Sequence, residues 1–138
     1  MKIINGEIIP GLKIGRYLIG MCRSEIEGLD FSEITDEDGS SIVKMENAIL
    51  WFDIQKTLRQ IAVTYPFADK YLGKIGLSNT MRDVKENFGE YITVEETYEI
   101  KGVQGMYFEL GDTKEEDNWN ELDAPIDWIF VCKESNIV

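Results

Sequence analysis

A pair of strand-like segments occurs twice in this sequence, and no other feature constrains the fold as strongly. Residues 49–54 (ILWFDI) resemble residues 105–110 (GMYFEL), and residues 58–63 (LRQIAV) resemble residues 126–131 (IDWIFV). Runs of β-branched and aromatic residues are typical of strands. Each pair of segments predicts a β-hairpin, and the second hairpin has a long connection at residues 111–125. We therefore expect the same hairpin in two copies.

A helix-like segment precedes each hairpin. The first covers residues 19–26, and the second begins near Ile75. In the second segment, Thr80 is followed three residues later by Asp83, which is the pattern of a capping box and marks a helix start. Gly89 then predicts the helix end, because glycine adopts the conformations found there at little cost. The sequence thus predicts two short helices.

Further segments add strands to the expected sheet. Residues 91–100 are rich in β-branched and aromatic types and predict one strand before a turn at Lys101 and Gly102. Residues 8–19 and 42–46 are weaker strand candidates. Together these elements predict an α+β fold, in which short helices pack on one face of an antiparallel sheet.

The length of the chain, 138 residues, suits a single domain with its own core. The duplicated pattern divides this domain, residues 1–138, into sub-repeats of about residues 8–66 and 67–134. Two copies are too few for a solenoid. A tandem repeat of a helix plus a hairpin is therefore expected within one domain.

Alternation along the duplicated strands assigns their side chains to two faces of the sheet. One face is expected to meet the helices and comprises Leu50, Phe52, Ile54, Met106, Phe108, Leu110, Ile129 and Val131. The opposite face carries Trp51, Asp53, Tyr107, Glu109, Trp128 and Phe130. An exposed patch of this kind is typical of a contact site, so Trp51, Tyr107 and Trp128 are candidate partner-binding residues. The alternative is that a further segment covers them and makes them a second core.

The charge of the chain is acidic and regional. Asp and Glu outnumber Lys and Arg by 26 to 14, so the net charge is −12. This charge opposes direct binding to nucleic acid or to anionic membranes and suits a basic partner. Residues 25–38 and residues 109–127 each carry a charge of −7, so the rest of the chain is nearly neutral.

The residue types of common catalytic and metal sites are scarce. The sequence contains no histidine, which is the commonest general base and metal ligand. Cys22 and Cys132 are far apart in the sequence without metal or redox spacing, and we expect reduced thiols. The acidic segment that follows Asp36 lacks the spacing of an EF-hand, and Asp38 with Gly39 predicts a turn. No catalytic residue, metal or cofactor is therefore expected.

The first residues, MKIINGE, reach an acid at the seventh position and do not form the apolar core of a secretion signal. No later run approaches the roughly 20 apolar residues that span a membrane. The chain is thus expected in the cytoplasm.

The connection at residues 111–124 is the most informative acidic stretch. A loop of this length inside a compact domain is usually functional or mobile. Its acids could mimic the negative charge of phosphate and bind a basic cleft of a partner, with the Trp119 side chain as an aromatic anchor. The candidate contact residues are Asp112, Glu115, Glu116, Asp117, Trp119, Glu121 and Asp123. The alternative is a solvated excursion whose acids only keep the protein soluble.

The segments at residues 19–26 and 75–89, each followed by an aromatic hairpin, resemble the tandem units of the β-lactamase-inhibitor-like fold. The pattern is also similar to that of small outer-membrane assembly lipoproteins, which carry one unit. This resemblance implies that helices pack on one sheet face and that the open face, with Trp51, Tyr107 and Trp128, binds another protein. The chain departs from those families because it lacks their lipobox and disulfides.

A small acidic domain with acidic loops is similar to the immunity proteins of bacterial polymorphic-toxin systems. This resemblance implies a non-catalytic inhibitor that neutralises a cognate toxin, a basic nuclease, by masking its active-site face. A second interpretation is a small-ligand-binding or regulatory domain that uses the open sheet face as a pocket. A third is an enzyme that relies on carboxylates alone, and the residues favour it least. The oligomeric state does not follow from the sequence.

Overall fold

The computed structural model describes residues 4–26, 32–111 and 119–133. Two antiparallel sheets contain all the strands of this part of the chain. A small sheet comprises β1 (Ile8–Ile9), β2 (Lys13–Ile14) and β3 (Tyr17–Leu18). The large sheet comprises β4 (Ser32–Thr35), β5 (Ser41–Lys44), β6 (Ala48–Phe52), β7 (Leu58–Val63), β8 (Tyr91–Val94), β9 (Thr97–Ile100), β10 (Met106–Leu110) and β11 (Ile126–Cys132). The helical elements are the 3-10 turn η1 (Arg23–Glu25) and the helix α1 (Met81–Phe88).

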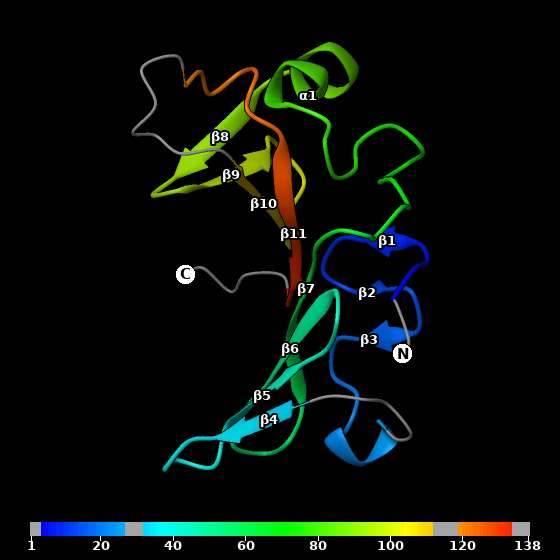
Figure 1. The fold of residues 1–138 in the computed structure, drawn as a ribbon, viewed down its shortest axis with the longest axis vertical. Helices are drawn as coiled ribbons and strands as arrows, with labels where there is room; N and C mark the ends of the chain where they lie inside the picture. Colours follow the sequence, from blue (N-terminus) through cyan, green and yellow to red (C-terminus); the bar gives the residue numbers. More distant parts are fainter. Residues whose placement is uncertain (1–3, 27–31, 112–118, 134–138) are drawn as a thin grey trace.

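The large sheet joins two four-stranded meanders edge to edge. Its strand order is β4-β5-β6-β7-β11-β10-β9-β8, so β7 and β11 meet at the centre, where Val63 pairs with Ile129 (Figure 1). The two hairpins that resemble each other in sequence are β6–β7 and β10–β11, which occupy equivalent places on either side of this seam. Each hairpin has a register irregularity toward the end of its first strand, between Trp51 and Phe52 and between Glu109 and Leu110.

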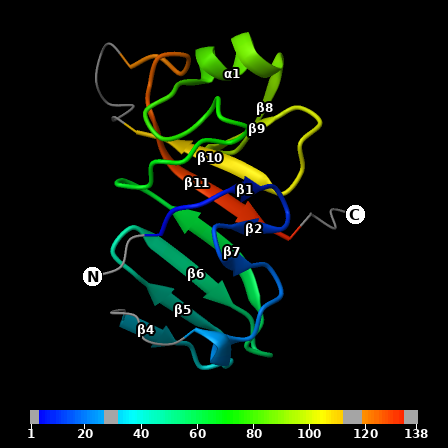
Figure 2. The same cartoon turned by 90° about the vertical axis from the view of Figure 1, so that its right-hand side faces the viewer.

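The expected α+β fold with helices covering a sheet is wrong. Of the described residues, 43% lie in strands or bridges and only 9% are helical. One face of the large sheet is covered mainly by β1–β3 and by the long segment between β7 and α1, with α1 itself at one end (Figures 1 and 2). The protein is therefore mostly β, and a small second sheet takes the place expected for a first helix.

The segment at residues 19–26 forms only the short turn η1 instead of the expected helix. Its backbone groups are used in bonds to the large sheet: the Gly20 N–H donates to the Leu58 carbonyl at 2.8 Å, and the Leu58 N–H donates to the Met21 carbonyl at 2.9 Å. Groups bonded in this way cannot enter the i to i−4 pattern of an α-helix. This segment is thus an extended chain along the start of β7.

The strands of residues 91–100 also differ from the expectation of one strand. The chain reverses at Glu95, which has a positive φ of 57°, so β8 and β9 form a hairpin. The segment before Asp36 forms β4, which pairs with β5 across the expected turn at Asp38 and Gly39. Both β4 and β8 are edge strands. The sheet is therefore wider than the sequence pattern indicates.

The core lies between the covered face of the large sheet and the elements that cross it. Its fully buried side chains include Ile14, Val43, Leu50, Leu58, Ile61, Val63, Ile75, Met81, Met106, Phe108, Ile126 and Ile129. The alternation assigned from sequence is confirmed for Leu50, Phe52, Met106, Phe108, Ile129 and Val131, which are all buried. It is wrong for Ile54, which lies beyond the end of β6 and is 61% exposed.

The predicted helix start and end are confirmed for α1. The Thr80 side chain accepts a hydrogen bond from the Asp83 N–H at 3.2 Å, and the Asp83 carboxylate accepts one from the Thr80 N–H at 3.0 Å. Hydrogen bonds that the Asp83 carboxylate accepts from the Asn79 side chain and from the Thr80 N–H lower the pKa of Asp83 below its ordinary value. Gly89 follows the last helical residue with a φ of 93°.

Replacing Thr80 with alanine is expected to lower the free energy of unfolding by about 1 kcal/mol, because the Asp83 N–H loses its acceptor. Chemical denaturation at neutral pH measures this change. The variant Thr93→Ala, at an exposed position of β8, removes the same atoms outside any helix cap and is expected to cost less. Equal losses in the two variants would show that the cap contributes nothing specific.

Among the described residues, no helix combines the length and the apolar character that crossing a membrane requires.

Candidate functional site

The face of the large sheet opposite the core, which we call the open face, carries a cluster of four aromatic residues. We call Trp51, Tyr107, Trp128 and Phe130 the aromatic face. The Phe130 ring lies at the centre: its centroid is 4.5 Å from that of Tyr107, 6.2 Å from that of Trp51 and 6.3 Å from that of Trp128. Phe130 is buried by these neighbours, whereas the other three are half-buried. The assignment of these residues to one face from alternation is confirmed.

Strand register brings the four rings together from three strands. Phe130 on β11 pairs with Tyr107 on β10 and, on its other side, with Ala62 on β7. Because Ala62 has only a methyl group, the rings of Phe130 and of Trp51 on β6 can approach each other above it. The aromatic face is therefore continuous across the seam between the two meanders.

The elements that cover the core lie on the other side of the sheet. In Figure 1, β1–β3, η1 and α1 all lie on one side of the large sheet, and the open face is turned the other way. Within the described part of the chain, no helix or strand packs over the aromatic face. The alternative of a second core covered by a further segment thus has no support among those residues.

Apolar side chains continue the open face to both edges of the sheet. In the first meander, Ile34 pairs with Ile42, which pairs with Trp51. In the second, Ile92 and Val94 on β8 point to the same face. The exposed fractions of Ile34, Ile92 and Val94 are 52%, 47% and 52%. Apolar side chains therefore lie along the open face of the first meander and again at the edge strand β8 of the second.

The hydroxyl of Tyr107 is fixed by a hydrogen bond across the open face. It donates to Oε1 of Gln60, on β7, at 2.7 Å. Burial raises the pKa of Tyr107 to about 12, and the nearby Cys132 thiol and Glu109 carboxylate add to the shift. Burial also raises the pKa of Cys132, with a further contribution from Glu99. At neutral pH both groups are therefore neutral, and neither is suited to nucleophilic chemistry.

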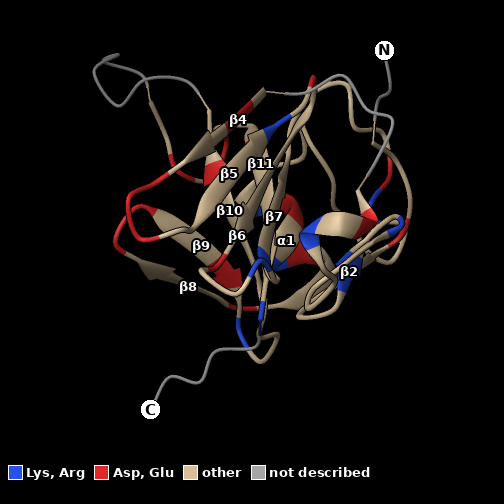
Figure 3. Ribbon diagram, turned by 90° about the horizontal axis from the view of Figure 1, so that it is seen from below, with Lys and Arg blue, Asp and Glu red and all other residues tan. Residues whose placement is uncertain are grey.

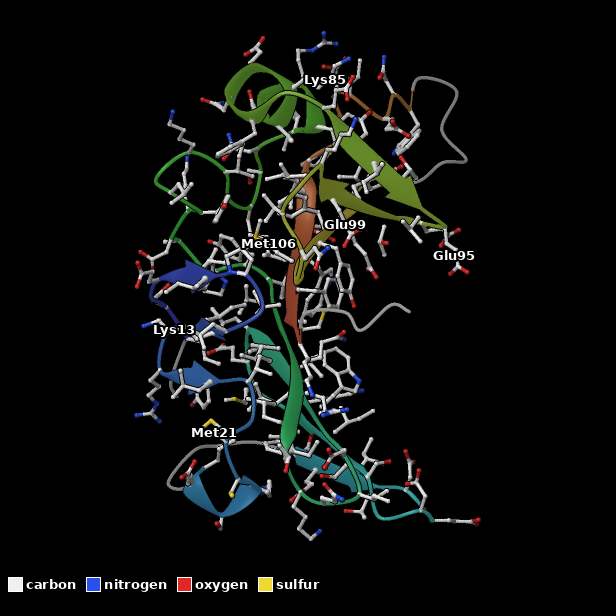
Figure 4. All side chains as sticks on the ribbon, turned by 180° about the vertical axis from the view of Figure 1, so that it is seen from behind. Lys13, Met21, Lys85, Glu95, Glu99 and Met106 are labelled. Carbon is white, nitrogen blue, oxygen red and sulfur yellow. The ribbon has the colours of Figure 1, made fainter. Side chains whose placement is uncertain are left out.

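Acidic side chains border the second half of the aromatic face. Glu109, which pairs with Trp128, and Glu99, which pairs with Ile92, point to the open face. Burial raises the pKa of Glu109, and the charges of Glu96 and Asp127 raise it further. Figure 3 shows acidic residues, in red, along this side of the molecule, opposite β2. In the view from behind, Glu95 and Glu99 lie on the side away from Lys13 and Met21 (Figure 4).

Of the acidic connection at residues 111–124, the structure describes only the two ends, residue 111 and residues 119–124. Asp112, Glu115, Glu116 and Asp117 lie outside the described residues. The Trp119 indole N–H donates to the Gly111 carbonyl at 3.3 Å, which joins the two ends of the connection. A partner contact at the four outer acids therefore stays a prediction.

The other acids expected to contact a partner form bonds within the chain. Glu121 accepts hydrogen bonds from the hydroxyls of Tyr91 and Tyr98, the latter at 3.1 Å. Asp123 forms a paired contact with the Arg82 guanidinium at 2.9 and 3.0 Å, which lowers the pKa of Asp123. Both acids anchor the connection to the α1 end of the covered face and are not brought to the aromatic face.

Three features of this surface do not follow from local sequence patterns. Alternation predicts the face of Phe130 correctly, but its central position follows from pairing with β7 and β10. Gln60 is a partner of Tyr107 only because β7 and β11 are neighbours. The prediction of a single strand at residues 91–100 does not bring Glu99 beside Tyr107, because that arrangement requires the chain reversal at Glu95.

The chain matches no family model, no curated protein sequence and no solved structure with which it was compared.

Proposed function

We propose that this protein is a non-catalytic inhibitor of the immunity type, which binds a basic protein toxin in the cytoplasm through the open face of its large sheet. The observation that carries the proposal is the aromatic face, which is uncovered by the described elements. Large aromatic side chains in a partly buried cluster are the residues that contribute most to protein interfaces.

The shape of the open face favours a protein over a small ligand as its partner. Exposed apolar side chains lie at both edge strands of the open face, with Ile34 on β4 and Ile92 on β8, and the aromatic face lies between them. Ligand sites are concave and enclose most of the ligand, whereas this surface follows a sheet. Two surface hollows formed by described residues, one beside Lys85 and one beside Arg16, involve no residue of the aromatic face. A macromolecular surface therefore fits the open face better.

Charge supports a basic partner, and a basic nuclease is one class of toxin with such a surface. The chain has a net charge of −12, and Glu99 and Glu109 border the aromatic rings. Complementary charge accelerates association and is screened by salt over roughly 8 to 10 Å. We therefore expect association to slow markedly as the salt concentration rises.

The proposal is tested by co-expression with the product of the adjacent gene, followed by purification at low and at high salt. The wild type is expected to form a stoichiometric complex and to protect the host cell. The variant Trp128→Asp is expected to weaken the complex by about 100-fold or more, because it removes an aromatic anchor and places a charge in the interface.

A matched variant separates loss of binding from loss of folding. Leu72→Asp introduces the same charge at a side chain that is 66% exposed on the segment between β7 and α1. It is expected to retain wild-type binding and protection, and circular dichroism checks the fold of both variants. A Trp128→Asp protein that still protects the cell would show that the open face is not the binding surface.

A further inference from the structure

Tyr107 lies between an aromatic ring and a carboxylate on neighbouring strands. Its ring stacks on Phe130 with an interplanar angle of 6°, so one ring face is occupied from the β11 side. On the other side lies β9, where Tyr98 pairs with Phe108 and the register places Glu99 opposite Tyr107. The second ring face of Tyr107 is therefore turned toward the strand that carries Glu99.

Glu109 adds a second carboxylate next to the same ring. It lies two residues after Tyr107 on β10, so both side chains point to the open face, and it pairs with Trp128. A group placed against Tyr107 would thus lie between two carboxylates and within reach of an indole. Tyr107, Glu99 and Glu109 all belong to the second meander.

The charges of these two carboxylates are not neutralised by the ion pairs of the described chain. The five ion pairs among the described residues use the acids Glu7, Glu33, Asp53, Glu90 and Asp123. The two carboxylates also act on neighbouring groups. In addition to burial, the charge of Glu99 raises the pKa of Cys132, and the charge of Glu109 contributes to the raised pKa of Tyr107. A cation supplied by a partner would relieve this repulsion.

Among cationic side chains, arginine fits this arrangement better than lysine. The guanidinium group is planar, stacks on an aromatic ring and still presents N–H groups at its edge to carboxylates. Paired N–H to carboxylate bonds are among the stronger hydrogen bonds of proteins. The ammonium group of lysine can pair with a carboxylate but cannot stack in this way.

Resting on the function proposed above, we propose that the second half of the open face contains a subsite for an arginine side chain of the basic partner. The guanidinium stacks on Tyr107 and pairs with Glu99 and Glu109. The first half of the open face, with Ile34, Ile42 and Trp51, contacts apolar surface of the same partner.

The subsite is tested with labelled hexa-arginine and hexa-lysine peptides as probes, by fluorescence anisotropy on the full chain. The wild type is expected to bind hexa-arginine more tightly than hexa-lysine. The double variant Glu99→Gln with Glu109→Gln is expected to bind hexa-arginine about tenfold more weakly. The control Glu46→Gln with Glu86→Gln changes the net charge equally at exposed positions on a turn and on α1, and is expected to bind like the wild type.

The contribution of the ring is tested separately. Tyr107→Leu is expected to abolish the preference for arginine over lysine, and Tyr107→Phe, which keeps the ring, is expected to retain it. If the two double variants lose affinity equally, only net charge matters and the subsite is refuted. The same holds if hexa-arginine and hexa-lysine bind the wild type equally.

Failure of the subsite can be distinguished from failure of the proposed function. If Trp128→Asp abolishes binding of the protein partner while the Glu99 and Glu109 double variant leaves it unchanged, the open face is the binding surface but the arginine subsite is wrong. If neither change affects the partner, the open face itself is excluded as the binding surface.

Discussion

Replacing Gly105 with alanine is expected to lower the free energy of unfolding by about 3 kcal/mol. Gly105 has a φ of 86°, a conformation that costs a residue with a side chain about 1 to 2 kcal/mol. A Cβ atom there would lie 2.5 Å from the backbone nitrogen of Gly11 and 2.6 Å from its Cα. Backbone would have to move at both sites, which adds to the conformational cost.

The position matters because the Gly105 carbonyl joins the two sheets. It accepts hydrogen bonds from the N–H of Gly11, in the turn between β1 and β2, and from the Cys132 N–H of β11, both at 3.0 Å. Displacing Gly11 would break the first of these bonds and shift the small sheet away from the core that it covers. For a chain of this length, 3 kcal/mol corresponds to a decrease of roughly 10 °C in the melting temperature.

The variant Gly102→Ala is the matched control for this prediction. Gly102 has nearly the same φ, 87°, and a Cβ atom there would have no neighbour within 4 Å. Only the conformational cost of about 1 to 2 kcal/mol is expected at this position. Thermal and chemical denaturation of both variants measure the difference. Equal losses would mean that the close approach to Gly11 contributes nothing to stability.

The features that the sequence predicted correctly depend on neighbours in the chain. The hairpins β6–β7 and β10–β11 follow from alternation, and the start of α1 follows from Thr80 and Asp83. The aromatic face could be predicted for the same reason, because residues two apart in a strand share a face. Local patterns of this kind do not depend on how distant segments pair.

The features that the sequence predicted wrongly depend on contacts between distant segments. Residues 19–26 carry a helix-like pattern, but Gly20 and Met21 bond to Leu58 and hold the segment extended. The residue that reverses the chain between β8 and β9 is Glu95, which is not a typical turn residue, so the sequence does not predict this hairpin. The position of Glu99 beside Tyr107 could not be predicted without that turn.

A single buried amide, that of Asn47, determines how the N-terminal segment is held, and its removal is expected to cost about 3 kcal/mol. Asn47 lies in the turn between β5 and β6 and is 0% exposed. Its Oδ1 accepts a hydrogen bond from the Ile4 N–H at 2.9 Å, and its Nδ2 donates to the Ile4 carbonyl at 3.0 Å. In Asn47→Ala both backbone groups of Ile4 lose their partners, and each buried group without a partner costs about 1 to 3 kcal/mol.

The variant Asn87→Ala is the control for a lost amide hydrogen bond at the surface. The Asn87 amide donates to the Asp83 carbonyl at 2.8 Å on the exposed side of α1. Water replaces that bond, so a change of about 0.5 kcal/mol or less is expected. Denaturation at neutral pH compares the two variants.

Replacing Asn47 with aspartate removes the Nδ2 donor to the Ile4 carbonyl. The free energy of unfolding of this variant is expected to decrease as the pH rises. Ionised aspartate can still accept from the Ile4 N–H, but it faces the Ile4 carbonyl without a proton to donate and buries a charge. The folded state therefore raises the pKa of this carboxyl above its unfolded value of about 3.9.

The folded state of Asn47→Asp binds the proton more tightly than the unfolded state. The stability of this variant relative to the wild type is therefore expected to fall as the pH rises from the unfolded pKa, about 3.9, through the higher pKa of the folded state. Near pH 4 the protonated carboxyl can both donate and accept, as the amide does, and much of the loss seen at neutral pH should be recovered. Asn47→Ala has no titrating group and should remain destabilised by the same amount at both pH values. Parallel pH profiles for Asn47→Asp and the wild type would show that the amide is not buried against Ile4.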